Sequence, residues 1–268
     1  RLDPHSYRPN EFFANNWVYE GLVKYDGGTL QPALATAWTS EVSADGVGET
    51  FRFTLRTGVK FHDGADFDCS VVKLNFDHVW AGDLTSPDWH GWYGLPGALK
   101  DWSCDGETFV LNTNAPYYPL LQELSYIRPM VMLSPNAFVG GAASDPYTQN
   151  SCPTGWGTVA ATADHAEVTC AGTTAIAGTG PFQFTSRTAN ADNADNDDLV
   201  VFTKNADYWN VANTGDIEEL HVVGTYADSA AVKAAMLDGS LDAVVGASVL
   251  LPSDEEELGA MTGFDLSY

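Results

Sequence analysis

Basic side chains are scarce in this 268-residue chain. Lys and Arg together number 12 against 36 Asp and Glu, which gives a formal net charge of −24. So acidic a chain has little positive charge to offer phosphate groups, which argues against a nucleic-acid partner. An anionic membrane surface would also repel it. The charge favours solubility and suits a saline or extracytoplasmic setting, but it identifies no ligand.

Long apolar runs are also missing. No stretch approaches the ~18 residues that span a bilayer, and the first residues, RLDPHSYRPN, lack the pattern of a signal peptide. Hydrophobic residues nevertheless make up 44% of the chain and aromatic residues 12%. This content is too high for a disordered acidic polymer and is sufficient for a sizeable core. We therefore expect a globular protein, and the length permits one large domain or two small ones.

The common catalytic signatures are absent as well. The chain contains no Gly-x-Ser-x-Gly elbow, no His-Glu-x-x-His, no phosphate-binding loop and no dinucleotide fingerprint. Its histidines are scattered, with no i, i+4 pair on one helical face, which argues against a preformed metal cage. The sequence therefore predicts a protein that is not an enzyme and carries no cofactor. A secreted hydrolase that uses two of the many carboxylates is the alternative.

Cysteine occurs four times and never as Cys-x-x-Cys, so neither a zinc knuckle nor a thioredoxin-type site is indicated. The four positions are Cys69, Cys104, Cys152 and Cys170. Their spacing favours two disulfides, for which three connectivities exist. We prefer the pairing of Cys152 with Cys170 because both lie in one loop-like stretch. Four buried thiols are the other interpretation.

Hydrophobic periodicity predicts a mixture of helices and strands without strict alternation, which is typical of a mixed α/β (α+β) fold. Residues 139–178 lack aliphatic periodicity and are interpreted as a long surface excursion. Turn residues and apolar spacing predict a first helix that ends near Gly21 and runs into a short strand. Helices are predicted at 68–80, capped by Asp68 or Ser70, at 117–126 and at 230–237, and strands at 51–55, 107–113, 178–186, 197–209, 220–223 and 241–245, the last of them buried.

The candidate binding residues are aromatic or cationic. Arg128 lies in the apolar stretch SYIRPMVML, where a cation needs an anionic partner, either a protein carboxylate or the carboxylate of a ligand. The stretch WHGWYG is either the edge of a core or a stacking wall for a small ligand. The full set of candidates is Tyr7, Phe12, Trp89, His90, Trp92 and Arg128.

Several stretches together resemble a known family. They are LDPHSYRPNEFFANNWVYEGLVKYD, LQPALATAWT, FRFTLRTGVKFHDGADFDCSVVKLNFDHV, NAPYYPLLQELSYIRPMVMLSPNAF, GTGPFQF, FTKNADYW and AMLDGSLDAV, in this order along the chain. They resemble the N-terminal lobe of the extracellular solute-binding proteins of ABC transporters, family 5, in the peptide and nickel group. The start of the chain and YYP-x-LQEL-x-x-x-RP are most similar to the nickel-binding branch.

This resemblance implies a periplasmic-binding-protein-like II fold and a receptor that closes over a small solute. The solute would be nickel or another metal chelate, or an oligopeptide, and an ABC permease in the membrane would receive it. The resemblance further implies a monomer located outside the cytoplasm, whether periplasmic, secreted or membrane-tethered. A sensor or adhesion domain without a transport role is a further alternative.

Residue by residue, the resemblance implies a site with aromatic walls and one anion anchor. Tyr7, Trp92 and Arg128 match residues of the nickel branch, and Phe12 falls where that branch has a methionine. Trp89 stands where the branch has an arginine, directly before His90, which would supply a hydrogen bond or a metal bond. The resemblance also implies that residues 1–268 form lobe I, with a disulfide-pinned insertion at about 140–177, and that the second lobe is absent from this sequence.

Overall fold

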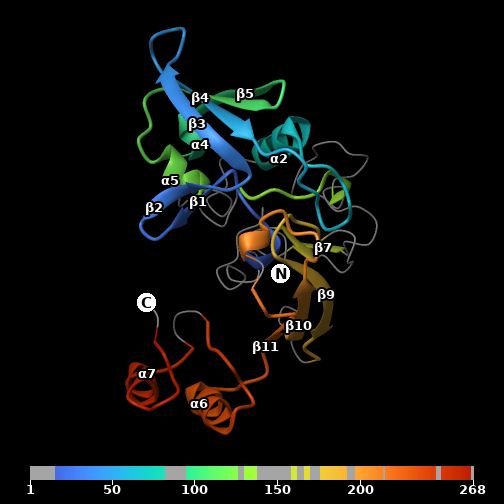
Figure 1. The fold of residues 1–268 in the computed structure, drawn as a ribbon, viewed down its shortest axis with the longest axis vertical. Coiled ribbons are helices and arrows are strands. Elements are labelled where there is room, and N and C mark those ends of the chain that lie inside the picture. Colours follow the sequence, from blue (N-terminus) through green and yellow to red (C-terminus); the bar gives the residue numbers. More distant parts are fainter. Residues whose placement is uncertain are drawn as a thin grey trace. The chain divides into compact units, whose positions relative to one another are not determined.

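The computed structural model describes residues 16–81, 95–125, 130–137, 158–161, 166–169, 176–191, 197–213, 215–245 and 249–266. The chain divides into two compact units. One comprises residues 1–185 and 202–220, and the other comprises residues 186–201 and 221–268. Helices and strands are mixed in both halves of the sequence, so the predicted mixed α/β class is confirmed (Figure 1).

The first unit contains a hairpin of β1 (Val23–Asp26) and β2 (Thr29–Pro32). These strands pair antiparallel across a two-residue turn, Gly27-Gly28, in which both residues have positive φ angles of 56° and 81°. Such a turn matches the right-handed twist of the strands, and glycine adopts it without steric cost. Helical residues 16–18 precede the hairpin, which agrees with the predicted passage from a helix to a strand.

A four-stranded antiparallel sheet follows, with the strand order β3–β4–β6–β5. Its strands are β3 (Ala35–Val42), β4 (Glu49–Leu55), β5 (Leu99–Asp105) and β6 (Thr108–Thr113). In β4, Phe51, Phe53 and Leu55 are buried while Arg52 and Thr54 are exposed. Phe53 lies opposite Phe109 of β6. The alternation that predicted strands at 51–55 and 107–113 is confirmed.

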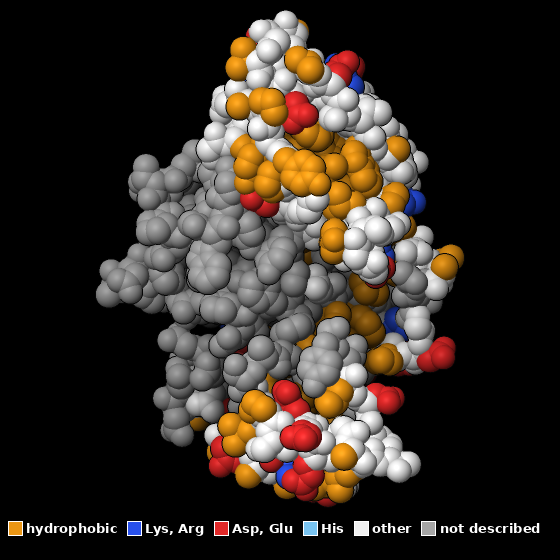
Figure 2. Space-filling model, turned by 90° about the vertical axis from the view of Figure 1, so that its left-hand side faces the viewer, with side chains coloured by type: hydrophobic (Ala, Val, Ile, Leu, Met, Phe, Trp, Pro, Cys, Tyr) orange, Lys and Arg blue, Asp and Glu red, His pale blue; other side chains and the backbone are white. Residues whose placement is uncertain are grey.

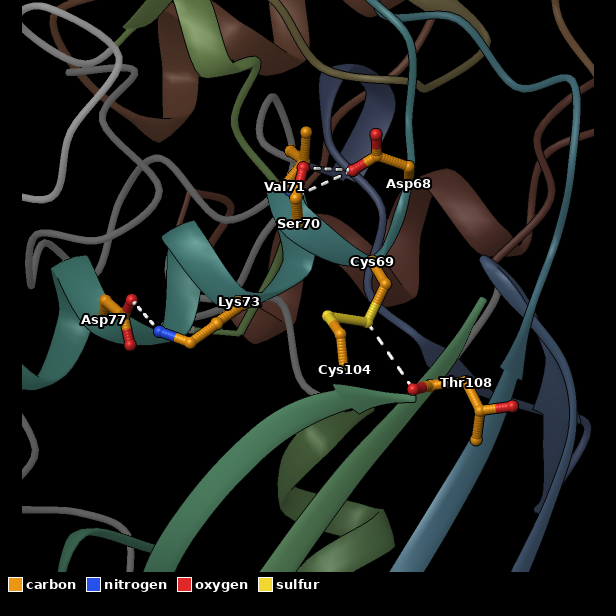
Figure 3. Close-up of a disulfide and its surroundings, with 8 residues drawn as sticks. All are labelled: Asp68, Cys69, Ser70, Val71, Lys73, Asp77, Cys104 and Thr108. Atoms are coloured by element: carbon orange, nitrogen blue, oxygen red, sulfur yellow. Dashed lines mark hydrogen bonds and ion pairs between the residues drawn. A yellow bond between two sulfur atoms is a disulfide. The ribbon is translucent and has the colours of Figure 1, made fainter. Parts of the chain in front are cut away.

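Helix α2 (Cys69–Ala81) covers the buried face of this sheet. The Asp68 carboxylate caps it by accepting a hydrogen bond from the Val71 backbone N–H at 3.0 Å, so Asp68 rather than Ser70 is the cap (Figure 3). The Phe76 ring lies 4.7 Å from the Phe109 ring and 5.7 Å from the Trp102 ring. The core of the first unit is therefore an aromatic layer between α2 and the sheet.

A disulfide joins Cys69, at the start of α2, to Cys104 in β5 (Figure 3). The Cys69 sulfur lies 3.6 Å from the Thr108 carbonyl oxygen. Because a disulfide sulfur carries no proton, this approach is a packing contact. One of the predicted disulfides is thus present. Cys152 and Cys170 lie outside the described residues, so their pairing remains a prediction.

The rest of the first unit contains short elements. They are α4 (Leu95–Ala98), α5 (Leu120–Leu124), the 3-10 turns η2 (Pro135–Ala137) and η5 (Val211–Asn213), and the hairpin of β7 (Thr158–Ala161) with β8 (Ala166–Thr169). Helix α5 is shorter than the predicted 117–126, although its Leu120 and Leu124 are buried as expected. The β7–β8 hairpin lies within the predicted surface excursion at 139–178, where no strand was predicted and short Thr- and Val-containing segments pair.

A three-stranded sheet has the order β11–β10–β9 and contains β9 (Phe182–Ala189), β10 (Asp197–Lys204) and β11 (Glu219–Val223). Its strands agree with those predicted near 178–186, 197–209 and 220–223, although β10 ends before the NADYW motif. The Arg187 guanidinium and the Asp197 carboxylate form an ion pair at 2.7 Å, with both side chains largely buried.

The second unit contains α6 (Ser229–Asp238) and α7 (Pro252–Gly259). Helix α6 agrees with the helix predicted at 230–237; Asp228 caps it, and Gly239 ends it with a φ angle of 77°. The prediction of a strand at 241–245 is wrong. These residues adopt no strand and are mostly exposed, because a strand needs a hydrogen-bonding neighbour and none of the described strands pairs with this segment. Figure 2 shows carboxylates and apolar side chains together on the described part of one molecular face.

Candidate binding site

The six candidate binding residues, Tyr7, Phe12, Trp89, His90, Trp92 and Arg128, lie outside the described residues. Described segments flank them in the sequence. The described chain resumes at Asn16 after the first pair. In the sequence, α2 and α4 flank the stretch of Trp89, His90 and Trp92, and Ser125 and Met130 flank the stretch of Arg128. These flanking segments belong to the first unit.

Four segments of the first unit are joined through their backbones. They are residues 17–22, 130–134, 176–181 and 205–209. The Met132 N–H donates to the Glu20 carbonyl at 2.9 Å, and the Gly180 N–H donates to the Val18 carbonyl at 2.9 Å. The Ser134 N–H donates to the Ala177 carbonyl, and the Asn205 N–H donates to the Pro181 carbonyl. Segments far apart in the sequence are therefore fixed against one another.

The Glu20 side chain joins three of these segments at one point. Its Oε2 atom accepts hydrogen bonds from the Trp209 indole Nε1–H at 2.7 Å and from the Thr179 hydroxyl at 2.8 Å. Its Oε1 atom accepts a third from the Tyr208 hydroxyl at 2.8 Å. We call these four residues the Glu20 clasp. Each donor belongs to a sequence stretch of the family resemblance, GTGPFQF or FTKNADYW, and Glu20 belongs to a third.

Burial changes the acid–base properties of the clasp. Desolvation raises the pKa of Glu20 above its usual value, and the hydrogen bonds from Trp209, Thr179 and Tyr208 oppose this rise without cancelling it. Burial and the neighbouring Glu20 carboxylate together raise the pKa of the Tyr208 phenol. The phenol is therefore a hydrogen-bond donor over the whole physiological pH range.

Two glycines allow the segments to approach so closely. A Cβ atom at Gly178 would lie 1.9 Å from the Val18 carbonyl oxygen, and one at Gly180 would lie 2.4 Å from the Trp17 carbonyl oxygen. These distances are far below van der Waals contact, so a side chain at either position would force the two segments apart. The glycines of the GTGP stretch are thus required by packing.

The side chain of Arg56 lies over the ring of Trp209. The Arg56 guanidinium carbon lies 4.0 Å from the Trp209 ring centre, and the Arg56 Nε–H donates to the Ala33 carbonyl at 3.1 Å. This cation–π contact holds the indole ring in the plane from which it donates to Glu20. The clasp is thereby tied to the beginning of the β3–β4–β6–β5 sheet.

A cavity of about 640 Å³ lies beside the clasp, within the size range of small-molecule sites. Its lining includes residues that border the segments of the predicted site. Asn16 follows the segment of Tyr7 and Phe12, while Ser125 and Val131 border the segment of Arg128. Asn16, Tyr19, Glu20, Ser125, Val131 and Trp209 are among the residues that line the cavity.

Helix α2 is tied to the same framework by a buried asparagine. The Asn75 Nδ2–H donates to the Leu133 carbonyl at 3.0 Å, and the Asn75 Oδ1 accepts from the Leu133 N–H at 2.8 Å. Asn75 is fully buried. The helix that precedes Trp89, His90 and Trp92 in the sequence is thus fixed to the segment 130–134, which follows Arg128.

Sequence reasoning did not identify Glu20, Tyr208 or Trp209. The available signal was a single carboxylate within an otherwise apolar segment, VYEGLV, but its partners are 159 to 189 positions away. Among the described residues, no cluster of three or more His, Cys, Asp or Glu side chains could hold a metal ion. Across that same part of the chain, every helix is too short or too polar to cross a membrane.

The sequence profile described as bacterial extracellular solute-binding proteins, family 5 Middle, matches residues 29–262. The chain therefore belongs to this family. Because the family is extracellular, the predicted location outside the cytoplasm is confirmed. The chain is also similar to the nickel-binding periplasmic protein of Escherichia coli K12. The two are 40% identical over 139 residues, which is 51% of this chain and 25% of that protein.

A second curated relative is the glutathione-binding protein GsiB of Salmonella paratyphi A. It is 44% identical over 122 residues, covering 44% of this chain and 22% of that protein. Among solved structures, NikA of Brucella suis in complex with Fe(III)-EDTA superposes with a TM-score of 0.69 and 32% identity, covering 96% of this chain and 43% of NikA. DppA of Helicobacter pylori in complex with a peptide, at 22% identity and a TM-score of 0.67, shares the fold.

These similarities confirm the predicted family, its fold and the likeness to the nickel-binding branch. The named relatives are binding proteins and not enzymes, in agreement with the prediction, and none favours the hydrolase or the sensor. The aligned region covers a quarter or less of the two curated relatives and less than half of NikA. The activity of the whole protein is therefore a matter for proposal.

Proposed function

We propose that this chain forms lobe I of an extracytoplasmic receptor that captures a small solute and delivers it to an ABC permease. The solute is nickel in a small organic chelate, another metal chelate or a short peptide. The observation that carries the proposal is the family match over residues 29–262. The 40% identity to a nickel-binding protein supports the metal chelate first. The proposed partners are the solute and the permease.

Within this proposal, Arg128 binds a solute carboxylate, and Tyr7, Phe12, Trp89 and Trp92 supply flat apolar walls. His90 donates a hydrogen bond to the solute or binds its metal. The framework supports the assignment because described segments that neighbour all three candidate stretches in the sequence are joined by hydrogen bonds, from Gly180 to Val18, from Met132 to Glu20 and from Asn75 to Leu133. A guanidinium can hold a carboxylate through two parallel hydrogen bonds, which gives both affinity and orientation.

The test is a calorimetric titration of the full-length protein with nickel–histidine chelate and with a dipeptide mixture. Arg128→Ala should weaken binding of a carboxylate-bearing solute by about 10- to 150-fold, which corresponds to the ~1.5–3 kcal/mol of a hydrogen bond to a charged group. Arg52→Ala is the matched control, because Arg52 is exposed and its ion pairs with Glu41 and Asp105 lie at the surface.

The outcomes separate the candidate solutes. Chelate binding that Arg128→Ala removes and Arg52→Ala leaves intact would support the nickel-like function. Binding of the dipeptides alone would assign the protein to peptide uptake. If the wild-type protein binds neither probe, the proposed transport function is wrong, and the sensor or adhesion role becomes the better hypothesis.

A further inference from the structure

We propose that Glu20 is a positioning residue for solute binding, which holds the binding segments in place without contacting the solute. This inference rests on the proposed function. The Glu20 side chain joins its own segment to residues 176–181 and 205–209, while its backbone bonds to the segment that follows Arg128.

The first step concerns the carboxylate itself. Three donors, Trp209, Thr179 and Tyr208, converge on it at 2.7–2.8 Å. Both oxygen atoms are therefore engaged within the protein. A side chain bound in this way is fixed in one rotamer, so the backbone that carries it is fixed as well.

The second step concerns the path from the clasp to the predicted binding residues. The Glu20 carbonyl accepts from the Met132 N–H, and Gly21 forms an antiparallel bridge with Val131. A displacement of residues 18–22 therefore displaces 130–132, which begin two positions after Arg128. In the other direction, residues 18–22 continue toward Phe12 through only a few residues.

The cavity beside the clasp offers a competing explanation, in which the Glu20 charge acts on the solute directly. The two explanations predict different effects of glutamine at position 20. An amide oxygen at position 20 can accept from Trp209 and Thr179, and its N–H can donate to the Tyr208 hydroxyl oxygen. Glu20→Gln thus preserves the clasp and removes the charge, whereas Glu20→Ala removes both.

The experiment measures the dissociation constant of the full-length protein for whichever probe, nickel–histidine chelate or dipeptides, the wild type binds. All titrations are made at a temperature at which circular dichroism shows each variant folded. Glu20→Ala should weaken binding by about 2- to 30-fold, the range for residues that couple to a site through a packed network. Glu20→Gln should recover most of that loss.

A control variant separates positioning from general destabilisation. Phe53→Leu removes a fully buried ring from the centre of the β3–β4–β6–β5 sheet and should lower the melting temperature while leaving the dissociation constant within about twofold of the wild type. Trp209→Phe removes one donor of the clasp and keeps the aromatic ring. It should weaken binding in the same direction as Glu20→Ala, and it serves as the test if Glu20→Ala does not fold.

Each outcome decides the question. Unchanged affinity in Glu20→Ala, or in Trp209→Phe if the alanine variant does not fold, would overturn the positioning role. Equal losses in Glu20→Gln and Glu20→Ala would overturn it in favour of direct contact between the Glu20 charge and the solute. Equal losses of affinity in Phe53→Leu and Glu20→Ala would overturn the positioning role, because they would show that Glu20 affects binding only through the stability of the fold. A wild-type protein that binds neither probe would overturn the proposed function and this inference with it.

Discussion

The Cys69–Cys104 disulfide should contribute a large share of the stability of the first unit. It closes a loop of sequence separation 35. The chain-entropy relation for a loop of this length gives about 4 kcal/mol at 25 °C, as an upper value, because the cross-link restricts the unfolded chain. The double variant Cys69→Ala/Cys104→Ala should therefore lower the free energy of unfolding by about 2–4 kcal/mol.

The choice of alanine follows from burial. Cys69 is 3% exposed and lies in the core cluster, where a serine hydroxyl would add an unsatisfied polar group. The assay is denaturant unfolding followed by circular dichroism. The slope of the free energy against denaturant should rise in the double variant, because the unfolded chain without the cross-link exposes more surface.

Reductant provides the control. Reduced wild-type protein should lose at least as much stability as the double variant loses. Any further loss when the double variant itself is reduced would come from a second disulfide, which tests the predicted Cys152–Cys170 pair independently. A loss of less than about 1 kcal/mol in the double variant would refute the entropy argument, because it would mean that the unfolded chain already keeps α2 close to β5.

Two further predictions concern the clasp region. Gly178→Ala should destabilise the protein by more than about 2 kcal/mol, because its Cβ would overlap the Val18 carbonyl. Gly97→Ala, whose Cβ would meet nothing within 4 Å, should stay within about 1 kcal/mol of the wild type in the same unfolding experiment; equal effects of the two variants would contradict the packing argument. The second prediction concerns pH. The pKa of Glu20 is raised in the folded state, so the folded protein binds the proton more tightly than the unfolded protein. The contribution of Glu20 to the free energy of unfolding is therefore present at low pH. It is lost as the pH rises from about 4.5 through the raised folded pKa. Unfolding free energies of the wild type should therefore fall relative to those of Glu20→Gln across that window, and a relative rise would show that the three hydrogen bonds outweigh desolvation.

Local chemistry made several elements predictable. Strand β4 shows its buried face through the alternation of Phe51, Phe53 and Leu55. Helix α6 begins at an aspartate cap and ends at Gly239, where a positive φ angle favours glycine. Such signals act within a few residues, so a single sequence contains them. The same is true of the motifs that identified the family.

Long-range pairing was not predictable in this way. Residues 241–245 have the apolar content of a strand, but a strand depends on a neighbour that its own residues cannot specify. The spacing of the cysteines allowed three connectivities, and the fold placed Cys69 beside Cys104. Hairpin β7–β8 was missed because its two strands are only four residues long and carry little periodicity.

The sequence by itself determined the family, the mixed α/β class, the acidic surface and most of the helices and strands, because composition and local periodicity encode them. Only the tertiary structure revealed the Glu20 clasp, since Glu20 meets Thr179, Tyr208 and Trp209 across 159 to 189 positions. A buried carboxylate is stable only where donors converge on it. That convergence is a property of the folded chain and of no single segment.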